Sequence, residues 1–404
     1  MTTEQGGFRV VIAGGGVAAL EATLALRALA REPVEIELIA PDNDFVYRPL
    51  AVTDPFRVGE TKRFPLAALV EAAGGALRPG RLAAVDPDRR VVLTDEGAER
   101  SYDALVVALG ARPQEAVHGA LTFSGPESRA DLDTMLEQAL AGDVHRIAFA
   151  LPAGAAWPLP LYELALLTSA FLVDRGTVGV ELVLVTPEER PLALFGQQAS
   201  DAIAELLAMR GIETQLRTTP IRFQSGVLRV AASDDVVADR VVALPRLEGP
   251  RVEGLPSDAE GFLPVNAHCR VGSEPDVYAA GDATQFPLKQ GGIAAQQADV
   301  AAADIAARLG STVEPTPFRP VLRGLLLTGM TARFLRAEPG TAASSIDTEP
   351  LWWPPAKIVG RYLAPFLASK LGLSEEVPTS TAEEGVRVEV ELDLDDHASW
   401  RPLA

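Results

Sequence analysis

The sequence predicts an α/β protein with two doubly wound parallel sheets and a smaller C-terminal α+β domain. Short apolar strands alternate with alanine- and leucine-rich helical segments in two successive cycles, the pattern of a parallel sheet covered by helices. The first cycle resumes at Val277 after the second has ended, so the second domain is expected to be inserted in the first. After Pro315 the alternation gives way to strand-like runs and a Trp-Trp-Pro-Pro corner at 352–355.

The first cycle begins with a βαβ unit, because a strand, a helix and a second strand follow one another within about 30 residues. Its expected elements are strands at 9–13, 34–39, 90–93 and 104–109, a strand from 277, and helices at 17–29 and 291–309.

The second cycle repeats this order and is expected to end in a small β-meander. Its elements are helices at 131–140, 161–172 and 198–209, strands at 146–151 and 181–185, and meander strands at 221–223, 227–230 and 240–243. The first domain is therefore assigned to 1–113 and 250–315, the second to 114–249, and the C-terminal domain to 316–404. The last of these contains an amphipathic segment at 357–373 and an alternating stretch at 386–392, which is typical of an edge strand.

Composition limits the classes of function. The net charge is −19, from 55 acidic and 36 basic residues. This charge argues against nucleic-acid binding, which needs a cationic surface, and favours at most a peripheral contact with an anionic membrane. A single cysteine excludes an intrachain disulfide and a CxxC redox pair. Neither a signal peptide nor an apolar run of about 20 residues is visible. A cytoplasmic location is expected, with peripheral attachment to the inner face of the membrane as the alternative.

The turn after the first strand carries the phosphate-binding motif G-x-G-x-x-G/A. The motif consists of Gly14, Gly15, Gly16, Val17, Ala18 and Ala19. Gly14 permits the tight turn, Gly16 lets backbone amides approach a pyrophosphate, and the small Ala19 allows the helix to pack against the strand. The helix N-terminus then presents free N–H groups to the ligand. A glycine-rich turn without a ligand is the competing interpretation, but the βαβ context favours a Rossmann-like dinucleotide-binding domain.

One position departs from this motif. An acidic residue is expected at the end of the second strand, where it would bind the ribose hydroxyls, but Ala40 stands there. Asp42 lies nearby and is the candidate substitute.

Four stretches resemble the FAD-containing pyridine nucleotide-disulfide reductase superfamily. They are VVIAGGGVAALEAT at 10–23, FVYRPLAV at 45–52, YDALVVALGARP at 102–113 and DVYAAGDATQFPLKQGGIAAQQADVAAADIA at 276–306. The chain is most similar to the branch with sulfide:quinone oxidoreductases, flavocytochrome c sulfide dehydrogenase flavoproteins and type II NADH dehydrogenases. The resemblance implies two Rossmann-like domains, an FAD cofactor and oxidoreductase activity.

The resemblance also implies which further residues contact the cofactor. They are Arg48, Ala84, Ala108, Leu109, Gly110, Gly281, Asp282, Lys289, Gly291, Gly292 and Ile293. The carboxylate of Asp282 would accept hydrogen bonds from the ribitol chain. The helix start at 289–292 would lie under the pyrimidine end of the flavin, where its dipole and Lys289 stabilise negative charge. The competing interpretations are a solvent-exposed Lys289 and a surface Arg48. No catalytic acid or base is identified.

The second cycle lacks the features of a working nicotinamide site. The strand at 146–151 is followed by 152–160, PAGAAWPLP, in which prolines remove N–H donors and Trp157 occupies the place of a pyrophosphate. The next strand ends in Val-Thr-Pro-Glu, so the ribose-binding acid is displaced to Glu188. Cys269 is expected to be a buried, inert thiol, and the neighbouring His268 is expected to point to the opposite face of its strand. No metal site is predicted.

Two features bear on a quinone. The stretch 292–297 resembles a helix on which Gln296 and Gln297 would line a quinone pocket, with ordinary helix packing as the alternative. The segment 351–373 combines aromatic and basic side chains, which is compatible with a membrane-surface helix, a helix that covers the flavin, or a homodimer contact.

Three functional hypotheses follow. The leading one is an FAD-dependent oxidoreductase that takes electrons from an unidentified small-molecule donor and passes them to a quinone-like or small organic acceptor. The second is an NADH:quinone oxidoreductase with an atypical nicotinamide site. The third is a flavin-binding or sensor protein without turnover.

Overall fold

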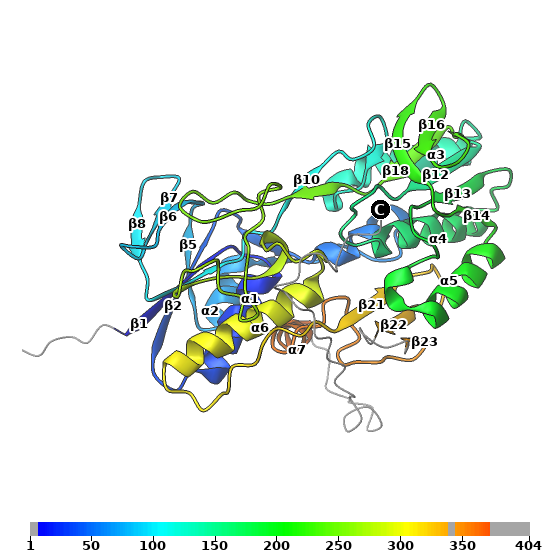
Figure 1. The fold of residues 1–404 in the computed structure, drawn as a ribbon. Coiled ribbons are helices and arrows are strands. Elements are labelled where there is room, and N and C mark those ends of the chain that lie inside the picture. Colours follow the sequence, from blue (N-terminus) through cyan, green and yellow to red (C-terminus); the bar gives the residue numbers. More distant parts are fainter. Residues whose placement is uncertain (1–6, 338–343, 372–404) are drawn as a thin grey trace, which may run out of the picture.

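The computed structural model describes residues 7–337 and 344–371, and Figure 1 shows their fold. The first domain is built on a five-stranded parallel sheet in the order β20-β9-β1-β2-β5. These strands are β1 (Phe8–Ala13), β2 (Val34–Ala40), β5 (Ala76–Pro79), β9 (Ala104–Val107) and β20 (Val277–Ala279). β20 comes from far along the chain, as expected from the resumed cycle.

Both faces of this sheet are covered. Helices α1 (Val17–Leu29) and α6 (Gly291–Arg308) pack together on one face. On the other face lies an antiparallel sheet of β6 (Leu82–Asp86), β7 (Val91–Thr94) and β8 (Glu99–Ser101). Val11 and Leu105 share an apolar cluster with Val92 of this second sheet. Burial on both sides explains the continuous apolar runs of the strands.

The remaining elements of the first domain, like β5, β6 and β8, were not predicted from the sequence. They are β3 (Asp44–Val46), η1 (Arg48–Phe56), β4 (Arg63–Pro65), α2 (Leu66–Ala72) and η4 (Gly281–Ala283).

The second domain repeats the plan with the parallel order β11-β18-β12-β13-β14. Its strands are β11 (Leu121–Thr122), β12 (Arg146–Ala150), β13 (Glu181–Val185), β14 (Ile212–Gln215) and β18 (Arg240–Ala243). Its helices are η2 (Pro126–Ser128), α3 (Arg129–Ala141), α4 (Leu159–Asp174), η3 (Ala193–Phe195) and α5 (Gln197–Met209).

The predicted meander is wrong in one strand. β15 (Thr219–Gln224), β16 (Val227–Ala231) and β17 (Val236–Val237) form the meander. β18 instead pairs in parallel with β12 inside the main sheet. Val241, Val242 and Ala243 are buried, and a strand buried on both faces gives the same short apolar run as a meander strand.

Two short strands carry the chain between the domains. β10 (Arg112–Gln114) leads into the second domain and β19 (Arg246–Glu248) leads out, and the two pair in antiparallel. The second domain is therefore inserted in the first, as predicted. Figure 1 shows this ribbon bridging the two sheets.

The C-terminal domain contains an antiparallel sheet of β21 (Leu322–Leu326), β22 (Arg333–Ala337) and β23 (Ser344–Asp347), followed by α7 (Leu363–Lys370). Of the amphipathic segment at 357–373, the described part is helical from Leu363, and Gly360 disfavours a helix before that residue. The predicted edge strand at 386–392 lies outside the described residues.

A pair of carboxyl groups, the buried Glu21 and the partly buried Asp299, attaches α7 to the first domain. Glu21 of α1 accepts hydrogen bonds from the backbone N–H groups of Tyr362 (2.8 Å) and Leu363 (2.6 Å). Asp299 of α6 hydrogen-bonds to the Glu21 side chain. Burial, followed by the charge of Glu21, raises the pKa of Asp299 to about 9, so the two groups share a proton near neutral pH. Within the described ranges, no helix is long and apolar enough to cross a membrane.

Candidate functional site

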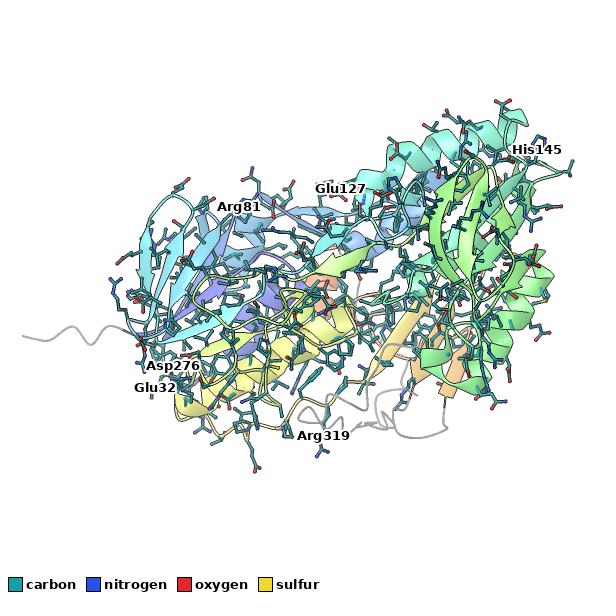
Figure 2. The ribbon with its side chains drawn as sticks, turned by 45° about the horizontal axis from the view of Figure 1, so that its top comes forward. Glu32, Arg81, Glu127, His145, Asp276 and Arg319 are labelled. Atoms are coloured by element: carbon teal, nitrogen blue, oxygen red, sulfur yellow. The ribbon has the colours of Figure 1, made fainter. Side chains whose placement is uncertain are left out.

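A cleft of about 1230 Å³ lies where the three domains meet. The first domain contributes the carboxyl ends of β1, β9 and β20, which is where open parallel sheets bind ligands. The loop before α4 and the start of that helix form the second wall, and β21 with Lys357 and Ile358 forms the third. Figure 2 shows two residues that line the cleft, Arg81 from the first domain and Glu127 from the second.

The turn after β1 has the geometry of a phosphate loop. Gly14 has φ +131, and a Cβ there would lie 2.2 Å from the carbonyl oxygen of Ala108. At Gly16 a Cβ would meet nothing within 4 Å, so the backbone at this point is open to the cleft. No side chain of the described residues caps the N-terminus of α1. The first-turn N–H groups therefore remain available for an anion, and the site fits the pyrophosphate of a dinucleotide.

Most predicted cofactor residues line this cleft. They are Gly14, Gly15, Gly16, Val17, Ala18, Asp42, Arg48, Ala108, Leu109, Gly110, Gly281, Asp282, Lys289 and Gly291. Ala19 is fully buried behind the turn, as its predicted packing role requires. Ala84, Gly292 and Ile293 do not line the cleft.

The start of α6 explains the positions of the last two. The N–H of Ile293 donates to Oε1 of Gln290 at 2.8 Å, so that N–H is satisfied within the protein. A Cβ at Gly292 would lie 2.7 Å from the same oxygen.

Lys289 is buried, which excludes the solvent-exposed interpretation. Its side chain is 8% exposed, and Nζ lies 3.8 Å from the centroid of the Phe262 ring and donates to the carbonyl oxygen of Thr284. Burial lowers the pKa of Lys289 to about 8, and the carboxylate of Asp282 offsets part of this effect. Burial also raises the pKa of Asp282, against the charge of Lys289. The pair places a titratable cation in the cleft wall at the start of α6.

Arg48 both lines the cleft and reaches its surface. Its guanidinium lies 3.2 Å from the carboxylate of Glu127 and is more than half exposed. Arg48 therefore fits both predictions made for it, because it is a surface arginine and also lines the cleft.

The two glutamines of α6 bind backbone groups. Gln296 accepts from the N–H of Val321 at 2.8 Å and donates to its carbonyl oxygen at 3.1 Å, while Gln297 accepts from the N–H of Gly281 at 2.8 Å. Neither side chain lines the cleft. The expectation that they line a quinone pocket is wrong, because each connects α6 to a neighbouring segment.

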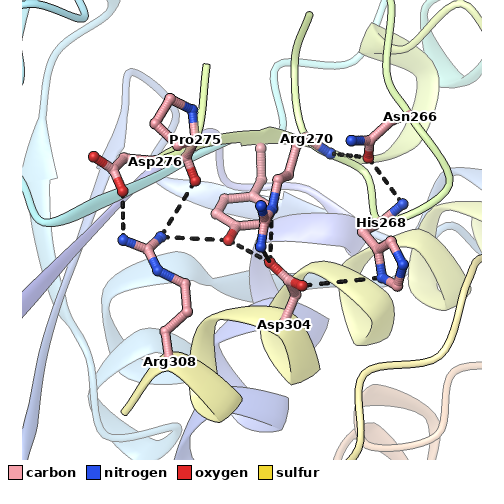
Figure 3. Close-up of polar contacts among 8 residues, drawn as sticks. Asn266, His268, Arg270, Pro275, Asp276, Asp304 and Arg308 are labelled. Atoms are coloured by element: carbon pink, nitrogen blue, oxygen red, sulfur yellow. Dashed lines mark hydrogen bonds and ion pairs between the residues drawn. The ribbon is translucent and has the colours of Figure 1, made fainter. Parts of the chain in front are cut away.

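The residues around Cys269 form a structural network on the far side of α6. Asp304 accepts from Arg270 at 2.6 Å and from the hydroxyl of Tyr278 at 2.5 Å, and Figure 3 shows this cluster. His268 points to Asp304 at 3.9 Å, whereas Cys269 is buried and burial raises its thiol pKa. Cys269 is thus a buried thiol, as predicted, but it lies in a turn rather than on a strand, because its N–H donates to the carbonyl oxygen of Asn266 at 2.9 Å. No group of three metal-ligating side chains occurs in the described part of the chain.

The loop at 152–160, after β12, is packed by its own and neighbouring side chains and lines the cleft. Trp157 packs edge-on against Phe195 with ring centroids 5.8 Å apart. The N-terminus of α4 follows Pro158, and the acidic residue after β13 is turned inward. Glu188 is buried and accepts from the hydroxyls of Tyr162 (2.5 Å) and Thr186 (3.0 Å).

The sequence analysis missed a buried ion pair in the cleft wall. Nζ of Lys357 lies 2.6 Å from Oε2 of Glu163 and also donates to the carbonyl oxygen of Pro49 at 3.1 Å. Oε1 of Glu163 accepts from the N–H of Leu327 at 2.8 Å. Burial raises the pKa of Glu163, and Lys357 offsets part of the shift. The signal was a single charge in the apolar run LPLYELALL, where an unpaired carboxylate is costly.

Comparison with known proteins identifies the family of this chain. The family described as pyridine nucleotide-disulphide oxidoreductase matches residues 8–144 and 164–303. The demethylphylloquinone reductase NdbB of Synechocystis is 27% identical over 347 residues, which cover 78% of this chain and 83% of that protein. An NADH dehydrogenase-like protein of Mycobacterium tuberculosis is 28% identical over 307 residues, 68% of this chain and 72% of its own.

Among solved structures, the sulfide:quinone oxidoreductase of Aquifex aeolicus has the same fold. It aligns with a TM-score of 0.76 at 20% identity and covers 84% of this chain and 87% of its own. The family match extends over both Rossmann-like domains and includes the phosphate loop and the segment around Asp282. The chain therefore belongs to the pyridine nucleotide-disulphide oxidoreductase family and is an FAD-dependent oxidoreductase.

Proposed function

We propose that this protein passes electrons from a small-molecule donor through FAD to a quinone-like acceptor in the cleft. The observation that carries the proposal is the Glu163–Lys357 pair, which is buried and lines the cleft. The similarity to a protein named demethylphylloquinone reductase supports a quinone as the electron acceptor.

The FAD would lie along the first wall of the cleft. The first turn of α1 would hold its pyrophosphate, with Gly16 leaving room for the phosphate oxygens. Asp42 would accept from ribose hydroxyls and Asp282 from the ribitol chain. Lys289 would place positive charge beside the flavin ring. When bound, the cofactor supplies the two electrons.

The ion pair would supply the proton chemistry. A quinone that becomes a hydroquinone takes up two electrons and two protons, and its oxygens acquire negative charge as the electrons arrive. The ammonium of Lys357 is a hydrogen-bond donor in the cleft wall, and Glu163 beside it holds or returns a proton at Oε2. A positioned acid of this kind typically contributes about 10²–10⁴-fold in rate.

The closed second loop favours a donor other than a nicotinamide. In the loop after β12, Trp157 packs against Phe195 and Pro158 has no N–H to donate, so a pyrophosphate would find few donors there, and the buried Glu188 is hydrogen-bonded to Tyr162. An NADH:quinone oxidoreductase is the second candidate, because a relative is named NADH dehydrogenase-like. Anaerobic mixing of the protein with NADH and NADPH separates the two: rapid bleaching of the flavin would support the second candidate.

The acceptor step is tested independently of the donor. The flavin is reduced photochemically without oxygen and mixed with naphthoquinone or with ferricyanide, which accepts electrons without protons. The Glu163→Gln variant should slow reoxidation by naphthoquinone about 10²–10⁴-fold and leave the ferricyanide reaction unchanged. Equal slowing with both acceptors would contradict the proposed role of Glu163. Failure of naphthoquinone to reoxidise the wild-type flavin would contradict the quinone assignment and favour a flavin-binding protein without turnover.

A further inference from the structure

Arg323 is a half-buried cation in the cleft wall without a protein partner. It lies on β21, and its carbonyl oxygen accepts from Nε2 of Gln290 at 2.7 Å, which places it beside the start of α6. Its guanidinium has neither a hydrogen bond nor an ion pair within residues 7–337 and 344–371. Burial, followed by the charge of Arg336 on the paired strand, lowers the pKa of Arg323.

The neighbouring cations of the cleft do have partners. Lys357 pairs with Glu163, and Lys289 has a carbonyl oxygen and a nearby carboxylate. Arg81 and Arg112 also line the cleft but are exposed, so water hydrates them. Arg323 differs from both groups, because it is partly removed from water, faces like charge across the sheet and has no carboxylate. An anion that enters the cleft would stabilise a guanidinium in such a position more than the remaining water does.

The pyrophosphate of FAD would lie elsewhere in the cleft and would not pair with Arg323. That group is assigned to the turn after β1, at the N-terminus of α1, whereas Arg323 belongs to the C-terminal sheet that faces the start of α6. The Glu163–Lys357 pair, to which the acceptor chemistry is assigned, lies in the same part of the wall: the N–H of Leu327, which directly follows β21, donates to Glu163.

We propose that Arg323 binds an anionic group, a carboxylate or a chemically similar oxyanion, carried by the quinone-like acceptor. This inference rests on the proposed function and specifies its substrate class. The planar guanidinium can bind two oxygens of one carboxylate in parallel, a geometry that a lysine cannot reproduce. The neutral ring would then lie toward the flavin and its charged substituent toward β21. An acceptor without the anion would leave the guanidinium unpaired and bind more weakly.

The test compares two acceptors that differ by one charged group. Photoreduced protein is mixed with naphthoquinone or with naphthoquinone sulfonate, and the half-saturating concentration for flavin reoxidation is measured. The Arg323→Gln variant should raise this concentration about tenfold to hundredfold for the sulfonate and leave naphthoquinone unchanged. The Arg323→Lys variant should recover part of the loss. Because each variant is compared with wild type on the same acceptor, the different potentials of the two quinones cancel.

Two controls keep the inference falsifiable. The remote, exposed Arg229→Gln variant removes the same charge and should not change the preference for the sulfonate. The flavin reduction potential of each variant is measured in parallel. Equal weakening of both acceptors, or a shifted potential without a change in preference, would overturn the inference and place Arg323 on the flavin.

A binding measurement separates this inference from the proposed function. Naphthalene sulfonate and naphthalene methanol cannot accept electrons, and their binding to the oxidised holoprotein is followed by calorimetry. Tighter binding of the sulfonate that is lost in Arg323→Gln supports the anion site even if neither quinone reoxidises the flavin. Equal binding of the two compounds to wild type would overturn it.

Discussion

Replacing Lys357 by Met should destabilise the protein through the carboxylate that it leaves behind. The methionine keeps most of the side-chain volume, but Glu163 is fully buried and would lose its cation while keeping the single N–H of Leu327. Breaking a buried ion pair in this way typically costs about 3–5 kcal/mol. An unfolding entropy of about 2.1 cal/mol/K per residue for a chain of 404 residues converts this cost to a decrease in Tm of about 4–6 °C.

The measurement is calorimetry of the holoprotein at neutral and acidic pH. The decrease in Tm should become smaller as the pH falls, because the buried, unpaired Glu163 is then protonated and carries no charge. The matched control is the double variant Glu163→Leu/Lys357→Met, which removes both charges and should recover most of the stability. A decrease in Tm below about 1 °C in the single variant, or a double variant that is no more stable than the single one, would refute this reasoning.

Three further predictions concern other parts of the molecule. Asp299→Asn should raise Tm near pH 8 and have no effect near pH 4: the folded pKa of about 9 lies above the unfolded value near 4, so the wild type loses stability as the pH rises between them. A thermal-shift series over this range checks it, and a constant difference would contradict it. Lys289, with its pKa lowered to about 8, should make the apoprotein more stable as the pH rises from about 8 to about 10.5, and Lys289→Met should flatten that slope in urea titrations. Gly16→Val should strongly lower the FAD content of purified protein with little change in the Tm of the apoprotein, because a Cβ at this position would enter the cleft and meet no protein atom within 4 Å; retention of bound flavin would count against the proposed position of the pyrophosphate.

Local patterns were sufficient to predict the glycine-rich turn after β1 and many, but not all, of the strands and helices. α1 and β13 occupy the predicted ranges because each is a single apolar run between clear breaks. The strand at 240–243 was assigned to the wrong sheet, since a short apolar run does not specify its neighbours. The Gln296 and Gln297 side chains could not be placed, because a helix position does not reveal which backbone group lies opposite.

The pairing and burial of the charged groups of the cleft could not be predicted from the sequence, because tertiary structure brings them together. Glu163 and Lys357 are 194 residues apart and come from different domains, so no spacing rule connects them. Arg323 is unremarkable in the sequence, and its isolation emerges only when β21 is placed beside α6. The buried state of Lys289 likewise depends on Phe262, which is not close to it in the chain.

The ribbon formed by β10 and β19 joins the segment that enters the second domain to the segment that leaves it. Since the outgoing and returning segments are hydrogen-bonded to each other, they twist or bend together when the second domain turns relative to the first. Arg112 and Pro113 of this ribbon also line the cleft. Any rotation of the second domain thus reshapes the cavity wall directly, so the width of the entrance and the angle between the two sheets change as one variable.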